Sequence, residues 1–208
     1  MKRDYSSMFT VGRSLSDEEK EENAQEEKQD GMFLRLLRTR NILLSGEVNK
    51  ALAERVVRQL LLLEEDSDDP IRVFIDSPGG DADAGYAIFD MLRFVKPDIY
   101  AIGMGLVASA GAIILLAAPK ERRIGLPNSH YLIHQPLSGI RGVATEIEIH
   151  ARELEKLRIK INQLISEETG QKLDKVENDT DRDFWMNADE AKDYGLISSV
   201  ISSRGELQ

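Results

Sequence analysis

One serine of the chain stands in a setting that favours nucleophilic chemistry. Ser109 follows the strand-like segment 99–104 and precedes the apolar, helix-like run 112–118. A serine at such a turn exposes its hydroxyl, and the first N–H groups of the helix are unpaired beside it. Those N–H groups could hold the oxyanion of an acyl-transfer intermediate. The alternative is a serine that only caps a buried helix. The motif is also not the strict G-x-S-x-G pattern, because position 107 is Val.

A serine nucleophile needs a base, and histidine is the usual one near neutral pH. The chain has three histidines. His150 falls inside a predicted helix and is expected at the surface. His130 and His134 flank a short strand and share one of its faces, because side chains alternate along a strand. His134 stands at the strand end, where it can reach a neighbouring loop; a purely structural role is its alternative.

A third group must orient the base. Chemistry alone does not choose it among 37 acidic residues, but the Asp-rich segment 179–183 precedes an apolar block at 184–186. Asp183 lies nearest that block, where burial would hold it against an imidazole. Gly79 and Gly80 follow another strand and, lacking a Cβ, allow a second oxyanion donor to approach. Together these pieces describe one acyl-transfer site.

Composition limits the possible classes of protein. A chain of 208 residues without repeats is most simply one domain with a real core. The net charge of -10 argues against nucleic acid and against an anionic membrane as partners. The longest apolar run, 105–118, is shorter than the roughly 20 residues that span a bilayer, and the N-terminus lacks an apolar signal core. Without cysteine there is no disulfide, thiol nucleophile or Cys-based zinc site. We expect a cytoplasmic protein.

The chain divides into two regions. Residues 1–31 carry many acids and no hydrophobic stripe, so we expect a mobile N-terminal segment. From residue 32 to 208 the pattern is that of a globular domain in which strands and helices alternate, which predicts α/β architecture with buried strands. The predicted strands are 40–46, 71–76, 99–104, 124–126, 131–133 and 195–201, and the predicted helices are 50–64, 84–95, 112–118, 145–169 and 188–193.

Eight ordered blocks resemble the proteolytic subunit (ClpP) family of ATP-dependent Clp protease. They are DSPGG (76–80), KPD (96–98), ASAGA (108–112), LPNS (126–129), IHQPL (133–137), ATEIEIHA (144–151), DTDRD (179–183) and EAKDYGLI (190–197). The resemblance covers about 41–201. It implies a ClpP/crotonase-like α/β fold, a spiral of ββα units with a protruding handle helix. It also implies a serine endopeptidase whose triad is Ser109, His134 and Asp183.

The resemblance further implies how substrate would be held. The oxyanion donors would be the N–H groups of Gly80 and Ala110. Two backbone segments would hold an extended peptide between them as an added strand, with little sequence selectivity. These substrate segments comprise Gly79, Gly80 and Asp81 on one side and Leu137, Ser138, Gly139 and Ile140 on the other.

Partners are implied in the same way. The helix from Thr145 would stack two heptamers into a homo- or hetero-oligomeric 14-mer, and Asp181 and Arg182 would link ring contact to triad alignment. A separate Clp-type AAA+ ATPase would feed peptides and unfolded proteins for protein quality control. It alone would use ATP, because this chain has no phosphate-binding G-x-x-x-x-G-K-[ST] loop; no cofactor or metal is expected here. The implied ATPase-docking residues are Leu60, Arg72, Phe74 and Phe94.

Several departures from the family pattern leave alternatives open. The acidic N-terminus replaces the family's usual entry segment, Arg72 stands at a usually aromatic position, and Ala110 replaces Met. Asp81 and Asp83 either face the peptide, favouring basic or neutral substrates, or pair with a helix N-terminus. A poorly active structural or regulatory subunit of a mixed 14-mer is the main alternative function. A crotonase-type acyl-CoA enzyme is disfavoured by the Ser–His–Asp set.

Overall fold

The structure is a computed structural model that describes residues 35–207. The predicted acidic segment 1–31 lies outside the described residues, and the predicted boundary after residue 31 stays a prediction. The chain forms two compact units, one ending at Thr39 and one starting at Arg40. In the first unit residues 35–38 are helical, and the Thr39 hydroxyl donates to the Leu36 carbonyl over 2.8 Å. The site lies entirely in the second unit.

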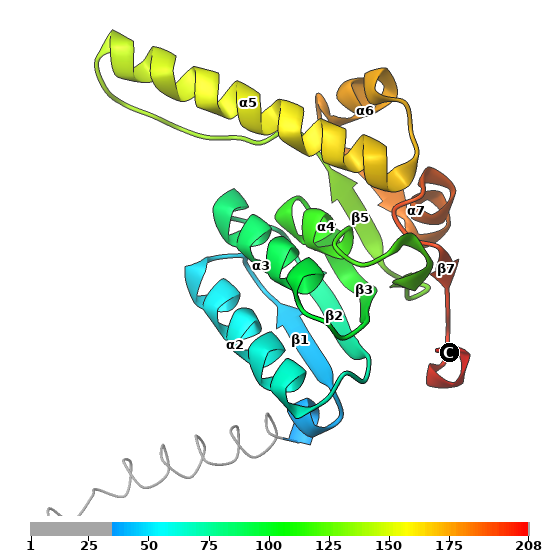
Figure 1. Cartoon of the computed structure of the whole chain (residues 1–208). Helices are drawn as coiled ribbons and strands as arrows, with labels where there is room; N and C mark the ends of the chain where they lie inside the picture. Colours follow the sequence, from blue (N-terminus) through cyan, green and yellow to red (C-terminus); the bar gives the residue numbers. More distant parts are fainter. Residues whose placement is uncertain (1–34, 208) are drawn as a thin grey trace, which may run out of the picture. The chain divides into compact units, whose positions relative to one another are not determined.

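A seven-stranded sheet forms the centre of the second unit (Figure 1). Its main path runs through five strands, and each neighbouring pair is parallel. In sheet order they are β1 (Asn41–Ser45), β2 (Ile71–Ser77), β3 (Ile99–Ala108), β4 (Arg123–Gly125) and β7 (Ser199–Val200). Off this path, β5 (His130–Ile133) pairs in parallel with the C-terminal end of β3, and β6 (Phe184–Asn187) pairs antiparallel with β5.

Helices follow most strands, as expected for an α/β fold. They are α2 (Lys50–Asp66), α3 (Ala82–Phe94), α4 (Ala110–Leu115), α5 (Ala144–Thr169), α6 (Leu173–Thr180) and α7 (Ala188–Tyr194), with 3-10 turns η1 (Lys120–Arg122) and η2 (Arg204–Glu206). Figure 1 shows α2 and α3 side by side and α5 extending well beyond the sheet. The buried residues of α5 all lie in its C-terminal part, from Ile161 to Thr169, so the remainder projects. The predicted handle helix is confirmed.

Local chemistry explains where the elements begin and end. The Asn49 side chain accepts from the N–H of Leu52 and caps the start of α2. In β2, Ile71, Val73 and Ile75 are fully buried, which favours an inner strand of a parallel sheet. The predicted strand 195–201 is wrong in extent. Gly195 ends α7 with a φ of 96°, and only β7 remains extended.

A partly buried ion cluster ties the C-terminal end of α5 to the body of the unit. The Arg123 side chain, 1% exposed, donates to the carbonyls of Leu116, Ala118 and Glu168 and to the Glu168 carboxylate. Arg93 from α3 contacts the same carboxylate. Burial lowers the pKa of Arg123, and Glu168 opposes that shift. The cluster fixes the base of the handle against α3 and α4.

Candidate active site

The backbone at Ser109 forms a sharp, strained turn between β3 and α4. Its φ of 54° and ψ of -120° lie outside the regions that suit residues with a Cβ. The N–H of Ser109 donates to the Leu132 carbonyl of β5 over 2.9 Å, which holds the turn. The Ser109 hydroxyl makes no capping hydrogen bond to α4. The helix-cap alternative is therefore wrong, and the geometry is that of a nucleophile elbow.

Strand register brings the predicted base and acid together. In the antiparallel pair β5–β6, Ile133 lies opposite Phe184, so His134 and Asp183 are the next facing positions. The Nδ1 atom of His134 lies 2.9 Å from Oδ1 of Asp183. The His134 side chain is 18% exposed and that of Asp183 is 61% exposed. The predicted burial of Asp183 is wrong, because the loop before β6 lies at the surface of the single chain.

Ser109 and His134 line one cavity of about 870 Å³. Within the described residues no hydrogen bond joins the Ser109 hydroxyl to the imidazole. Hydrogen bonds between catalytic groups are often long in a site without substrate. The single chain thus has an oriented imidazole and a half-buried serine on the same cavity.

The glycine turn after β2 packs directly against the serine turn. A Cβ at Gly79, whose φ is +88°, would lie 2.6 Å from the Ser109 Cβ and 2.9 Å from the Ala110 nitrogen. Val48 pairs with this turn: its N–H donates to Gly79, and its carbonyl accepts from Asp81, each over 2.8 Å. Among the described residues, nothing accepts from the N–H groups of Gly80 and Ala110. Two free donors beside Ser109 suit an oxyanion.

The acidic positions after the glycines belong to a helix and not to an extended segment. The Asp81 carboxylate accepts from the N–H of Ala84 over 2.7 Å and caps α3, and Asp83 lies in its first turn. Of the two alternatives for these acids, pairing with a helix N-terminus is right for Asp81.

The opposite wall of the cavity comes from the segment after β5. No strand forms over residues 135–143 in the described chain, and Leu137 and Gly139 are exposed. The Ser138 hydroxyl lies 2.8 Å from Nε2 of His150 on α5. His150 was expected at the surface, but it is half-buried and lines the cavity. The pair anchors this wall to the handle.

Comparison with known proteins gives the family. The Clp protease family model matches residues 24–204. The chain belongs to the Clp protease family. ATP-dependent Clp protease proteolytic subunit 2 of Treponema denticola is 65% identical over 179 residues, 86% of this chain and 90% of that protein. The Treponema pallidum protein of the same name is 61% identical over 193 residues, 92% of this chain and 97% of that protein.

The fold of the Clp protease family is also seen in a solved relative. A ClpP1 mutant from Listeria monocytogenes superposes with a TM-score of 0.80 at 49% identity, covering 85% of this chain and 99% of that one. The predicted ClpP-like α/β fold and the family resemblance are confirmed. No helix among residues 35–207 is both long and apolar enough to cross a membrane. Within the same residues, no three or more His, Asp or Glu side chains lie together so that they could hold a metal ion.

In this member of the Clp protease family, the loop that carries Asp183 is fastened next to His134. The N–H of Gln135 donates to the Thr180 carbonyl over 2.6 Å, and its side-chain amide donates to the Asp181 carbonyl over 2.7 Å. Arg182 is 90% exposed, and its Nε lies 3.9 Å from the Asp181 carboxylate. Gln135 was not among the predicted site residues, and its position directly after His134 was the available signal.

The loop also has an anchor on its other side. Asp179, at the C-terminal end of α6, accepts from the Tyr194 hydroxyl over 2.9 Å and pairs with Lys175 over 2.5 Å. Burial, together with Asp179, raises the pKa of Tyr194 well above its usual range. Neither α6 nor β6 was predicted from the sequence, so this support was missed as well.

The four predicted docking residues are exposed to different degrees. Phe94 is 76% exposed, and Arg72 and Phe74 are half-buried on β2. Leu60 is fully buried in the core, so the prediction that it lines a docking surface is wrong for the single chain. Phe74 instead packs in an apolar cluster that was not predicted, with Tyr100, Ile102, Ile124, Leu126, Ile201 and Leu207.

Proposed function

We propose that this Clp protease family member is a serine endopeptidase with Ser109 as nucleophile, His134 as base and Asp183 as the orienting acid. The observation that carries the proposal is the 2.9 Å His134–Asp183 contact on the same cavity as the strained Ser109 turn. The two free N–H groups of Gly80 and Ala110 add an oxyanion hole.

Each group has a defined task in the proposed reaction. The Ser109 oxygen attacks the carbonyl carbon of the scissile bond while Nε2 of His134 takes its proton. Asp183 keeps the Nδ1 proton in place and stabilises the imidazolium. The negative oxygen of the intermediate accepts from Gly80 and Ala110. His134 then gives its proton to the leaving amine, and water hydrolyses the acyl-enzyme by the same steps.

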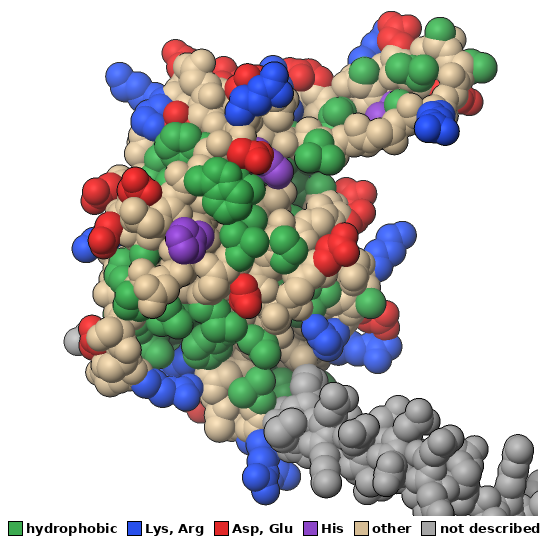
Figure 2. Space-filling model, turned by 180° about the vertical axis from the view of Figure 1, so that it is seen from behind, with side chains coloured by type: hydrophobic (Ala, Val, Ile, Leu, Met, Phe, Trp, Pro, Cys, Tyr) green, Lys and Arg blue, Asp and Glu red, His purple; other side chains and the backbone are tan. Residues whose placement is uncertain are grey.

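Assembly into stacked heptamers is part of the proposal. The projecting end of α5 and the segment before it carry exposed hydrophobic side chains, including Val143 at 66% and Ile149 at 55% exposure (Figure 2). Such a cluster on a free helix favours a protein partner. The exposed loop with Asp181 and Arg182 lies beside the base of the handle and next to Asp183. Contact between rings would therefore act on the orienting acid directly.

The proposed substrates are peptides and unfolded proteins delivered by a separate Clp-type ATPase in the cytoplasm. The chemistry assigned to Ser109, His134 and Asp183 uses no cofactor. The apolar cluster around Phe74 and the exposed Phe94 support a docking surface for the ATPase. Arg72 on the same strand would restrict which ATPase loops fit.

A poorly active structural ring subunit is the second candidate. The absence of a hydrogen bond between Ser109 and His134 in the described chain favours it. It predicts normal assembly with little or no turnover, even beside a second Clp protease subunit.

The deciding experiment compares wild type with Ser109→Ala, using Ser202→Ala as a matched exposed control. Hydrolysis of a fluorogenic peptide is measured for the purified chain alone and with a sister subunit, and native mass gives the assembly. We expect turnover that Ser109→Ala abolishes, unchanged assembly, and fluorophosphonate labelling of Ser109 alone. Turnover retained in Ser109→Ala contradicts the assigned nucleophile. Intact 14-mers without turnover or labelling identify the structural subunit.

A further inference from the structure

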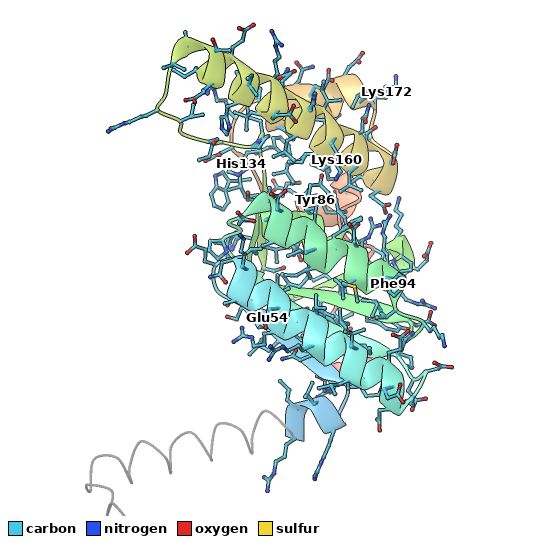
Figure 3. The ribbon with its side chains drawn as sticks, turned by 60° about the vertical axis from the view of Figure 1, so that its left-hand side comes forward. Glu54, Tyr86, Phe94, His134, Lys160 and Lys172 are labelled. Atoms are coloured by element: carbon cyan, nitrogen blue, oxygen red, sulfur yellow. The ribbon has the colours of Figure 1, made fainter. Side chains whose placement is uncertain are left out.

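The cavity continues past Ser109 into a channel between α3 and α5. Its inner wall is apolar and is formed by the buried side chains Ile113, Ile161 and Ile165. Figure 3 shows Tyr86 on α3 and Lys160 on α5 pointing into the space between the two helices, with His134 at one end of it. This channel, called here the side-chain channel, is where a substrate residue next to the scissile bond would extend.

Tyr86 lines the side-chain channel and carries a polar atom that no described residue uses. Its hydroxyl oxygen is buried and has no hydrogen-bond partner among the described residues. Burial raises the pKa of Tyr86 to about 12, and Asp90 adds to the shift, so the hydroxyl keeps its proton. A buried hydroxyl without a partner is unfavourable, because the group has lost its water. An acceptor group that enters the channel would relieve this cost.

Lys160 adds a positive charge at the same place. Its Nζ lies 3.7 Å from the centroid of the Tyr86 ring, and no described carboxylate is within ion-pair distance of it. The neighbouring Lys156 differs, because it pairs with Glu153 over 2.7 Å. Lys160 and Tyr86 thus offer two adjacent donors at the wall of a mostly apolar channel.

The charges around Tyr86 and Lys160 restrict which substrate side chains can bind in the channel. Asp83 and Asp90 lie on the same helix as Tyr86 and disfavour a further negative charge. A neutral side chain with a terminal carbonyl satisfies both donors without that repulsion. Its methylene groups would lie along the isoleucines.

We propose that Tyr86 and Lys160 are specificity-determining residues that select an amide side chain, glutamine above leucine, immediately before the scissile bond. The proposal rests on the proposed serine peptidase function. Tyr86 donates its O–H and Lys160 an N–H to the carbonyl of the amide. Lys160 is exposed, whereas the Tyr86 hydroxyl is buried, and a pocket that leaves a buried donor unpaired discriminates against a side chain that lacks the acceptor.

The test uses three peptides that differ only in Gln, Glu or Leu before the cleaved bond, assayed on the assembled enzyme. Tyr86→Phe keeps the ring and its contact with Lys160 but removes the hydroxyl. Lys160→Met keeps an apolar stem and removes the charge, and Lys172→Met removes an exposed charge outside the channel. We expect the Gln-to-Leu ratio of kcat/KM to fall about three- to tenfold in each channel variant and to stay unchanged in Lys172→Met.

A second readout separates this proposal from the proposed function. Peptidyl diphenyl phosphonates with Gln or Leu side chains phosphonylate an active serine with loss of phenol, and the labelling rate is followed by mass spectrometry. If hydrolysis and Ser109 labelling occur, but their Gln-to-Leu ratios are equal in wild type and in both channel variants, only the specificity proposal is overturned. A preference for Glu over Gln overturns the choice of a neutral amide. No hydrolysis and no Ser109 labelling overturn the proposed function itself.

Discussion

At the scale of single residues, the imidazole of His134 and the carboxylate of Asp183 meet although 49 positions separate them in the chain. The contact depends on the β5–β6 register, in which Ile133 faces Phe184. It leaves Nε2 of His134 as the atom that can accept the proton of Ser109. A slip of one residue in β6 would turn the carboxylate to the other face of the strand.

Replacement of the orienting acid tests this arrangement. Asp183→Asn keeps the size of the side chain but allows the imidazole to adopt the wrong tautomer. We expect kcat to fall by about 10³- to 10⁴-fold, with assembly unchanged. The measurement is hydrolysis of a fluorogenic peptide together with native mass, and Asp189→Asn on the exposed face of α7 is the control. A loss below tenfold would show that another acid orients His134.

At the scale of elements, the end of β5 holds the loop that leads to β6. Gln135 fastens this loop through its N–H and its side-chain amide, and Tyr194 fastens the preceding helix through Asp179. The carboxylate of Asp183 has no anchor of its own beyond His134 in the described structure. Its position therefore depends on these neighbouring contacts.

Gln135 is accordingly predicted to be a positioning residue. Gln135→Glu keeps the shape but removes the N–H donors of the side chain, and Gln135→Ala removes the side chain. Since a hydrogen bond contributes about 1 kcal/mol, we expect kcat to fall by about fivefold in both variants with KM little changed. Steady-state kinetics measure the split between the two constants. An effect on KM alone would contradict a role in positioning Asp183.

Most elements follow from sequence because they depend on local signals. The apolar strand 71–76, the Asn49 cap and the handle helix are examples. The elements that depend on tertiary contacts could not be predicted from sequence. The helix α6 is largely polar, and β6 is only four residues long and forms by pairing with β5. The same difference between local signals and tertiary contacts explains which site residues could be predicted. Ser109 and Gly79 carry a turn signal in sequence, whereas the contacts of Gln135 and Tyr86 exist only once distant segments pack.

At the scale of the whole unit, one carboxylate joins the handle to the body. Glu168 at the end of α5 contacts Arg93 from α3 and the buried Arg123 from β4. Removal of one member of a buried pair leaves an uncompensated charge, which is more costly than the absence of the whole pair. The base of the handle therefore contributes to the stability of the entire unit.

Glu168→Gln tests this role against Glu167→Gln, an exposed neighbour with the same change in charge. We expect Glu168→Gln to lower the free energy of unfolding by about 3 kcal/mol, which lowers Tm by roughly 10 °C in a domain of this size. Thermal unfolding followed by circular dichroism measures both variants. Equal Tm values for the two would show that Arg123 is satisfied by backbone carbonyls alone.

The strained backbone at Ser109 has a consequence for which residue can persist there. A glycine would adopt a φ of 54° without the steric cost that serine bears, a difference of about 1 to 3 kcal/mol. Ser109→Gly should therefore unfold at a higher temperature than wild type while losing all turnover. The cost of a strained serine at this turn is accounted for if Ser109 has the nucleophilic role proposed for it.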